Sequence, residues 1–475
     1  MTASSQHDRV QPGSPVVEQL IGRARSAQRQ FEQWNQEQVD EVVVAAGWAI
    51  MQPERNRALA EMAVRDTGLG VVADKITKNH RKTLGLLRDL KGAKSVGIIA
   101  EYPERGIVEI ARPVGVVAAI TPSTNPGATP ANKIINALKG RNAVIVAPSP
   151  KGASTCAALI GYVNAELAKV GAPPDLVQML PAPITKEATL ALMRQSDLVV
   201  ATGSQANVRA AYASGTPAFG VGAGNVAAII DASANLADAA AAIALSKTFD
   251  NATSCSSENS VVILDAVFDA ALAALEKVGG VMLDGEEKAR LQAEMWPHGK
   301  LNAQTTAQST ATIAGLAGLV RPKVSSAAFL MVREDGTGPH CPFSGEKLAP
   351  VIAVYRARDF DHACQIVADI YAYQGAGHSV GIHSADDEHI LRLGLELPVS
   401  RVIVNQIHCY ATGGSFDNGL PFSLSMGCGT WVRNNFSDNM NYRHYLNITR
   451  ISRKIPPQMP ALEDIFGEYF RKYGE

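Results

Sequence analysis

Apolar residues change their spacing along this chain, and each spacing predicts a different kind of element. Between residues 16 and 50, and again from about 53 to 90, apolar residues recur at helical spacing among charged ones. From about residue 107 they alternate with polar residues and then form short continuous runs, which is typical of strands that become buried. The sequence therefore predicts a helical N-terminal region followed by a strand-rich one.

The strand-rich region alternates with helical stretches of ten to fifteen residues. We predict strands at 114–120, 143–148, 176–180, 197–203 and 225–231, and helices at 131–140, 152–170, 185–195 and about 234–247. A strand, a helix and a second strand in succession form a right-handed unit with parallel strands. The predicted fold class is therefore α/β with a doubly wound parallel sheet, which binds ligands beyond the carboxyl ends of its strands.

Composition excludes several classes of partner. The formal net charge is -1, so nothing favours binding to nucleic acid or to an anionic membrane. No run of eighteen apolar residues predicts a membrane helix, and the polar N-terminus lacks the apolar core of a signal peptide. The six cysteines form no CxxC pair, which favours a reduced, cytoplasmic protein without a metal site.

One cysteine lies in unusual surroundings. The stretch SKTFDNATSCSSENSVVI, residues 246–263, places Cys255 in a turn of small polar residues just before a predicted strand. Most free cysteines are small buried core residues, but Ser254 and Ser256 are poor neighbours for a core thiol. Cys255 is therefore our candidate nucleophile.

Three further motifs follow predicted strands or precede one. TPSTNPGATP, residues 121–130, holds Asn125 between two prolines, where its amide suits an oxyanion or merely organises a turn. ATGS, residues 201–204, offers Ser204 as the N-cap of a helix, with or without a phosphate or nicotinamide at its N-terminus. GVGAGN, residues 220–225, departs from the dinucleotide fingerprint and precedes a strand, so we interpret it as a tight turn beside a ligand.

These motifs together resemble one family. TPSTNP, ATGS, FDNATSC with ENSVVI, and GEKLAPV (345–351) have the order and spacing of the aldehyde dehydrogenase superfamily. DTGLGVVADKITKNH, GVGAGN, SKTFDN, GAGHSVGIH and LSMGCGTW resemble its CoA-acylating branch. The resemblance runs from about residue 16 to 455, which is nearly the whole chain.

The resemblance implies a role for each matching residue. Cys255 would be the nucleophile, Asn125 the oxyanion donor and Glu346 a ligand of the nicotinamide ribose. The remaining positions implied to bind the nucleotide are Thr121, Pro122, Ser149, Lys151, Thr202, Gly203, Ser204, Gly222 and Gly224. His378, Ser254 and Ser256 are candidates for contact with CoA or the substrate.

The absence of a general base indicates which molecule accepts the acyl group. Hydrolytic members of the superfamily activate water with a Glu, whereas the matching segment here, residues 219–225, has no carboxylate. General-base catalysis contributes roughly 10²–10⁴-fold, so we expect transfer of the acyl group to CoA rather than to water. A hydrolytic dehydrogenase is the alternative, and an inactive fold serving as a scaffold or metal-binding protein is an alternative from another class.

The residues beside these motifs indicate which aldehyde and which nicotinamide nucleotide the enzyme would use. The hydroxyl-rich TSCSSEN favours an aldehyde with a polar or anionic tail, because burying such a tail in an apolar pocket would cost free energy. Over the whole chain the sequence most resembles the acylating sulfoacetaldehyde dehydrogenases, with acetaldehyde or succinate semialdehyde as alternative substrates. Ala147 and Pro150 replace the Lys and Glu of the adenosine-binding segment, so NADP or NAD is expected.

The resemblance also divides the chain into domains. We expect a disordered leader at 1–15, a nucleotide-binding domain at 16–232 and a catalytic domain carrying Cys255 at 233–430. The rest, 431–475, would form a small β arm and a C-terminal tail, because NYRHYLNITRISRKI alternates like a strand. A strand with a free edge favours pairing, so we expect a homodimer or homotetramer.

Overall fold

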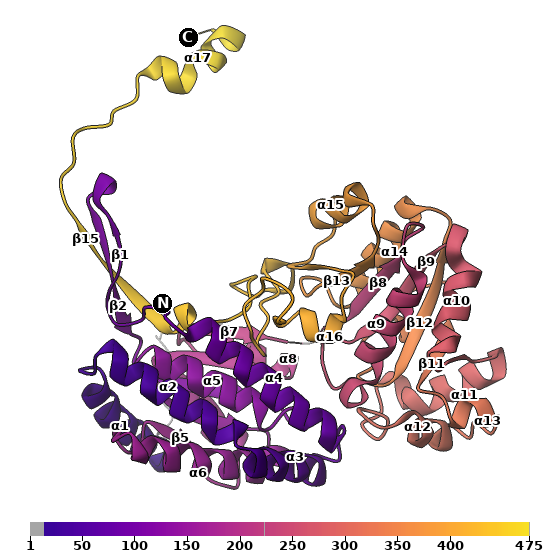
Figure 1. Cartoon of the computed structure of the whole chain (residues 1–475), viewed down its shortest axis with the longest axis horizontal. Coiled ribbons are helices and arrows are strands. Elements are labelled where there is room, and N and C mark those ends of the chain that lie inside the picture. Colours follow the sequence, from indigo (N-terminus) through magenta and orange to yellow (C-terminus); the bar gives the residue numbers. More distant parts are fainter. Residues whose placement is uncertain (1–13, 223, 475) are drawn as a thin grey trace, which may run out of the picture.

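Two parallel sheets and a small antiparallel arm make up the molecule (Figure 1). The computed structural model describes residues 14–222 and 224–474. Within these residues, no helix is both long enough and apolar enough to cross a bilayer. The prediction of an α/β fold is confirmed, while residues 1–13 of the expected leader lie outside the described residues.

Four helices form the N-terminal layer, as the helical spacing predicted. They are α1 (Pro15–Phe31), α2 (Gln36–Met51), α3 (Pro53–Thr67) and α4 (Val72–Leu90). Asn35 caps α2 in a reciprocal arrangement with Gln38, and Gly68 ends α3 in the left-handed region at φ 71°. α1 packs on strands of the first sheet, whereas α2, α3 and α4 pack on one another and on α5 (Ala128–Lys139) and α6 (Ala153–Lys169). α4 also contacts the short turn of helix at Phe249–Ala252.

The first sheet has the order β5-β4-β3-β6-β7, with all strands parallel. Its strands are β3 (Val116–Thr121), β4 (Ala143–Pro148), β5 (Val177–Met179), β6 (Leu198–Thr202) and β7 (Ala218–Val221). The connecting helices are α5 (Ala128–Lys139), α6 (Ala153–Lys169), α7 (Lys186–Gln195) and α8 (Gln205–Tyr212). Strand order reverses between β3 and β6, and this is where doubly wound sheets open a crevice for ligands.

The second sheet has the order β10-β11-β12-β9-β8-β13-β14 and is also parallel. Its strands are β8 (Val226–Ile230), β9 (Glu258–Leu264), β10 (Gly280–Met282), β11 (Phe329–Arg333), β12 (Val351–Ala357), β13 (Val380–His383) and β14 (Val402–Val404). Its helices are α9 (Leu236–Thr248), α10 (Phe268–Lys277), α11 (Gly285–Met295), α12 (Thr310–Leu316), α13 (Pro322–Ser325), α14 (Phe360–Tyr373), α15 (Asp387–Glu396) and α16 (His408–Ala411).

One strand belongs to a different sheet from the one expected. We placed the strand at 225–231 in the nucleotide-binding domain, but β8 pairs with β9 and β13 in the second sheet. The change of sheet therefore falls between β7 and β8, and the boundary expected at residue 232 is too late. An apolar run shows that a strand is buried, but it does not show which sheet buries it.

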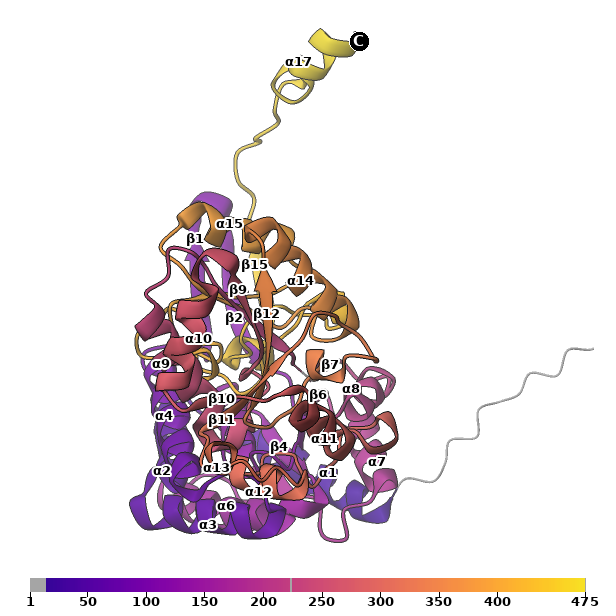
Figure 2. The same cartoon turned by 90° about the vertical axis from the view of Figure 1, so that its right-hand side faces the viewer.

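The arm combines two distant segments of the chain. β1 (Gly97–Tyr102), β2 (Ile107–Pro113) and β15 (Leu446–Ser452) form an antiparallel sheet in the order β1-β2-β15. The sequence indicated the late strand and the stretch from 107, but not that they pair. Helix α17 (Leu462–Tyr473) stands away from the body at the end of an extended linker (Figures 1 and 2).

Candidate active site

Cys255 lies in a polar turn directly before β9, as predicted. The serines on either side of Cys255 form hydrogen bonds with each other and so stabilise the turn. The hydroxyls of Ser254 and Ser256 are 2.9 Å apart, and the Ser256 N–H donates to Ser254 Oγ at 3.3 Å. Every residue of β9 is buried, which fixes the end of the turn. The hydroxyl-rich sequence is therefore explained at least in part by the turn rather than by a ligand.

A buried histidine lies against the thiol. His378 Nε2 is 3.3 Å from Cys255 Sγ, and His378 Nδ1 is 2.8 Å from Ser379 Oγ. Burial, with the Glu346 carboxyl and Cys428 nearby, raises the pKa of the Cys255 thiol to about 12. Burial, with Arg401 and His408 nearby, lowers the pKa of His378 to about 3. Both groups are therefore neutral at pH 7, and the imidazole is free to accept the thiol proton during attack.

The glycine segment approaches this pair through its backbone alone. A Cβ on Gly224 would lie 2.9 Å from His378 Cδ2 and would overlap the Cys255 carbonyl oxygen. The Gly224 N–H donates to Glu346 Oε1 at 3.2 Å, which brings Glu346 to the same place. Burial raises the pKa of the Glu346 carboxyl to about 8, so it is protonated at neutral pH and is a poor base for water.

Asn125 is positioned by a lysine of α4. It lies in the loop between β3 and α5, and its Oδ1 accepts a hydrogen bond from Lys78 Nζ at 2.8 Å. An ammonium group only donates, so this contact fixes which end of the amide is the oxygen. The Nδ2 end has a single long contact among the described residues, 3.5 Å to Thr124 Oγ1. That end is therefore available to donate to an oxyanion, and the role of Asn125 as oxyanion donor stays a prediction.

A buried ion cluster ties α4 to the Cys255 loop. Asp250 Oδ2 accepts from Lys78 Nζ at 2.6 Å and from Lys75 Nζ at 3.1 Å, while Asp250 Oδ1 accepts from the Val71 N–H at 2.7 Å. Asp250 and the next two residues have φ of 52°, 50° and 58°, a left-handed run that costs free energy in non-glycine residues. The ion cluster offsets this strain and fixes where the turn with Cys255 begins.

The residues predicted to bind the nucleotide gather at the carboxyl edge of the first sheet. Thr121 ends β3 and Thr202 ends β6, on the two sides of the point where the strand order reverses. The buried Thr121 Oγ1 has no hydrogen-bond partner among the described residues, whereas Thr202 Oγ1 is 2.8 Å from Ser425 Oγ. An unpaired buried hydroxyl is costly unless a ligand or water completes it.

The space between these strand ends is lined by small groups. A Cβ on Gly203, which has φ 148°, would find Pro122 at 3.7 Å as its nearest neighbour. Ser204 caps α8 as predicted, because its Oγ accepts from the Asn207 N–H at 3.3 Å. Gly222 lies against the Gln205 side chain. The N-terminus of α8 therefore opens onto the edge where the nucleotide is expected.

The predicted adenosine end lies after β4. The Ser149 N–H donates to the Thr121 carbonyl at 3.0 Å, so Ser149 adjoins the same edge, and Lys151 is exposed in the short turn of helix that follows. The predicted residues thus form two groups. The first comprises Cys255, His378, Gly224 and Glu346, which contact one another, together with Ser254 and Ser256 of the Cys255 turn. The others lie at the edge of the first sheet or, for Asn125, in the loop that follows β3.

Known proteins resemble this chain over nearly its whole length. The model of the aldehyde dehydrogenase family matches residues 11–288. The chain is 64% identical over 474 residues to "Sulfoacetaldehyde dehydrogenase (acylating)" of Cupriavidus necator, covering 100% of this chain and 96% of that protein. The chain belongs to the aldehyde dehydrogenase family.

Two further relatives support the same assignment. A protein of Bilophila wadsworthia, also named "Sulfoacetaldehyde dehydrogenase (acylating)", is 43% identical and covers 97% of this chain and 100% of its own length. The crystal structure of an acetylating aldehyde dehydrogenase from Geobacillus thermoglucosidasius superposes with a TM-score of 0.90 at 36% identity, covering 94% of this chain and 97% of that one. The resemblance stated from the motifs is confirmed.

Several site residues of this aldehyde dehydrogenase were missed by sequence reasoning. Lys75, Lys78 and Asp250 are charged residues that sequence alone suggests are exposed, yet all three are buried. Arg401 donates to the His378 carbonyl at 3.1 Å and so fixes the backbone that carries the imidazole. The available signal was that Asp250 lies inside SKTFDN, and Lys75 and Lys78 inside DTGLGVVADKITKNH, two motifs quoted for the family resemblance.

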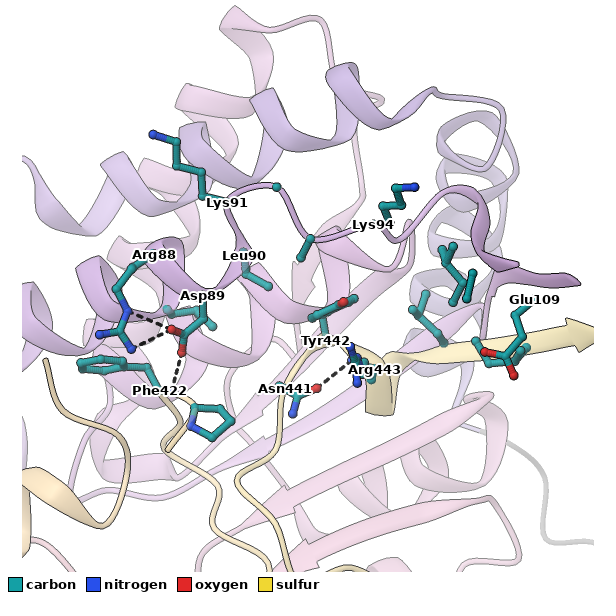
Figure 3. A pocket seen from close by; sticks show the side chains of 18 of the residues that line it. Arg88, Asp89, Leu90, Lys91, Lys94, Glu109, Phe422, Asn441, Tyr442 and Arg443 are labelled. Atoms are coloured by element: carbon teal, nitrogen blue, oxygen red, sulfur yellow. Dashed lines mark hydrogen bonds and ion pairs between the residues drawn. The ribbon is translucent and has the colours of Figure 1, made fainter. Parts of the chain in front are cut away.

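A separate and larger groove lies at the base of the arm. It has a volume of about 890 Å³ and is lined by α4, the arm strands and residues such as Phe422, Tyr442 and Arg443 (Figure 3). None of the residues predicted for the active site lines it. The groove therefore does not belong to the Cys255 site.

Proposed function

We propose that this aldehyde dehydrogenase interconverts sulfoacetaldehyde plus CoA and sulfoacetyl-CoA, with NADP or NAD as the hydride acceptor. The observation that carries the proposal is the 64% identity over the whole chain to the Cupriavidus necator protein of that name. The site supports the acylating part, because the segment beside Cys255 offers only glycine backbone and Glu346 is protonated at pH 7.

The chain's own residues account for the first half of the reaction. His378 accepts the proton from Cys255 Sγ as the sulfur adds to the aldehyde carbon, and Asn125 Nδ2 donates to the oxygen that becomes negative. A nicotinamide dinucleotide held by residues at the edge of the first sheet would supply the hydride acceptor, and loss of a hydride from the adduct would leave a thioester on Cys255. Neutral surroundings favour this sequence, since charge appears only in the transition state.

The second half returns the enzyme to its starting state. His378 first releases to solvent the proton that it took from Cys255. It then accepts the proton of the CoA thiol as the CoA sulfur attacks the thioester carbon, and it returns this proton to Cys255 Sγ when the bond between that sulfur and the acyl carbon breaks. A thiol of pKa near 8.5 is already partly ionised at neutral pH, so it needs less activation than water does. CoA replaces the nucleotide in one cleft, and the expected order is ping-pong.

The edge of the first sheet fits a nicotinamide dinucleotide. The unpaired Thr121 Oγ1, the open space over Gly203 and the N-terminus of α8 lie where the pyrophosphate and the nicotinamide are expected. Ser149 and Lys151 would contact a 2′-phosphate, which no carboxylate at position 150 repels. Glu346 would accept from the nicotinamide ribose.

Assembly and location complete the proposal. Strand β15 pairs with β2 on one side and is the last strand in the sheet order, so its other edge is available to a second copy. A homodimer or homotetramer built through the arm, residues 431–475 with β1 and β2, would use this edge. The protein would act in the cytoplasm on small molecules, without nucleic acid or membrane.

Initial rates test the proposal. Sulfoacetaldehyde, acetaldehyde and succinate semialdehyde are each compared with NAD and NADP, with and without CoA. We expect nucleotide reduction only with CoA and fastest with sulfoacetaldehyde. Equal rates without CoA would make water the acceptor, and a preference for either other aldehyde would overturn the substrate.

A further inference from the structure

A small cavity adjoins the Cys255 turn on the side of α4. Its volume is about 40 Å³, and its lining residues are Lys78, Arg81, Lys82, Asn125, Phe249, Ser254, Cys409, Tyr410 and Leu424. It borders both the residue before the nucleophile and the predicted oxyanion donor. Three of the lining residues are cationic and none is acidic, within the part of the chain that the structure describes.

The three cations come from one face of one helix. Residues 78, 81 and 82 of α4 are spaced by three and four positions, which places their side chains side by side. Such a cluster is unfavourable unless each charge has a counter-charge, a set of acceptors or a ligand. The hydrogen-bond partners of each cation therefore show which of the three still has donors available to a ligand.

Two of the cations already have their donors occupied. Lys78 Nζ donates to Asp250, Asn125 and Thr253, at 2.6, 2.8 and 3.0 Å. Lys82 Nζ donates to the carbonyl oxygens of three residues at 2.9 to 3.2 Å, which are those of Tyr410, Gly413 and Gly414. An ammonium group has three donors, so both are fully used.

Arg81 is different. Of its five N–H donors, the described residues engage one, in a long contact of 3.5 Å from Nη2 to Ser415 Oγ. Its guanidinium lies over the Tyr410 ring at 4.8 Å, which orients the group without using its N–H donors. Arg81 is thus a positioned cation with free donors in a cavity beside the nucleophile.

We infer that Arg81 binds the anionic tail of the aldehyde, a sulfonate, through its guanidinium. A planar fork of N–H donors matches two oxygens of a sulfonate or carboxylate. The small volume suits a tail separated from the reacting carbon by one methylene rather than a longer chain. The inference rests on the proposed function and assigns the residue that selects its substrate.

Arg81→Met tests this with a matched control. Arg88→Met removes a second arginine of α4 that also lies over aromatic rings, at 4.8 Å from the Phe422 ring, but does not line this cavity. We expect Arg81→Met to lower kcat/KM for sulfoacetaldehyde by roughly 10²–10³-fold, mostly through KM, and to change it for acetaldehyde by less than about threefold. Arg88→Met should leave both within about twofold of the unchanged enzyme.

Alkylation of Cys255 gives a readout independent of turnover. Iodoacetate and iodoacetamide have nearly the same size, but only the first carries an anionic group, which is bonded directly to the reacting carbon. Arg81→Met should lower the ratio of their rates at Cys255 by roughly tenfold, whereas Arg88→Met should preserve it. An unchanged ratio and unchanged sulfoacetaldehyde kinetics in Arg81→Met would overturn the inference.

The two proposals fail in different ways. If the unchanged enzyme does not prefer sulfoacetaldehyde, the proposed substrate is wrong, while the alkylation ratio still decides whether Arg81 attracts anions. If the unchanged enzyme prefers sulfoacetaldehyde and Arg81→Met keeps that preference, the function stands and the inference is wrong. Succinate semialdehyde tests whether the cavity distinguishes tails by length, since its carboxylate lies one methylene further from the aldehyde carbon than the sulfonate of sulfoacetaldehyde does.

Discussion

The two sides of the Cys255 turn differ in charge. On the side of the second sheet, the thiol faces His378, Gly224 and Glu346, and the shifted pKa values leave all of their titratable groups neutral at pH 7. On the side of α4, Lys78 and Arg81 bring positive charge to the same turn. The groups that face the thiol on the first side are neutral, with Arg401 behind them at the His378 carbonyl, whereas the second side brings cations to the turn itself.

This division separates two tasks. A neutral, buried thiol–imidazole pair costs less to bury than an ion pair and lets charge develop only during reaction. In the proposed mechanism, the cationic side would stabilise the negative charge that the reaction or the substrate brings, through Asn125 and through Arg81. Burial raises the pKa of the nucleophile to about 12, so the thiol stays protonated at rest although cations lie nearby.

Cys255→Ala should produce the largest loss. Without a sulfur no thioester forms, so we expect aldehyde oxidation to fall below detection while nucleotide binding persists. Steady-state rates and nucleotide titration measure the two effects. Cys341→Ala, which changes the other cysteine that is not fully buried, should retain full activity. Residual CoA-dependent turnover in Cys255→Ala would show that another group is the nucleophile.

His378→Asn should come next, because it removes the proton acceptor from the neutral side. We expect kcat to fall by roughly 10²–10⁴-fold, and the rate of Cys255 alkylation by iodoacetamide at pH 7 to fall with it. His298→Asn, at an exposed position, is the control. Alkylation as fast as in the unchanged enzyme would exclude His378 as the base.

Asn125→Ala instead weakens the cationic side. It removes the amide that Lys78 orients, and we expect kcat to fall by roughly 10²–10³-fold, which is typical of a lost oxyanion donor. Alkylation of Cys255 needs no oxyanion and should be unchanged, so the two sides separate experimentally. Asn164→Ala on α6 controls for a general effect of losing an amide. Slower alkylation in Asn125→Ala would mean that Asn125 acts on the thiol itself.

The two sides also differ in how far sequence could predict them. Cys255, Asn125 and the strand at 143–148 follow from local patterns, because a polar turn or an apolar run is visible within a few residues. The contact between Lys78 and Asp250 joins residues 172 positions apart, and burial of both charges reverses the usual expectation for such residues. Arg81 looks like any exposed helix cation until the cavity beside it is known.

Glu346→Gln should have the smallest effect on the reactivity of Cys255, and it tests whether the side facing the second sheet is neutral. Since burial raises the pKa of Glu346 to about 8, its carboxyl is neutral below that pH and becomes an anion beside Cys255 above it. That anion disfavours the thiolate, so alkylation of Cys255 should be equal in both enzymes at pH 6.5 and about two- to fivefold faster in Glu346→Gln at pH 9.5. The exposed Glu61→Gln should follow the unchanged enzyme throughout. A constant rate difference between the two enzymes from pH 6.5 to 9.5 would show that Glu346 is already an anion at neutral pH, and coincident profiles would show that it stays neutral throughout; either result would contradict a pKa of about 8.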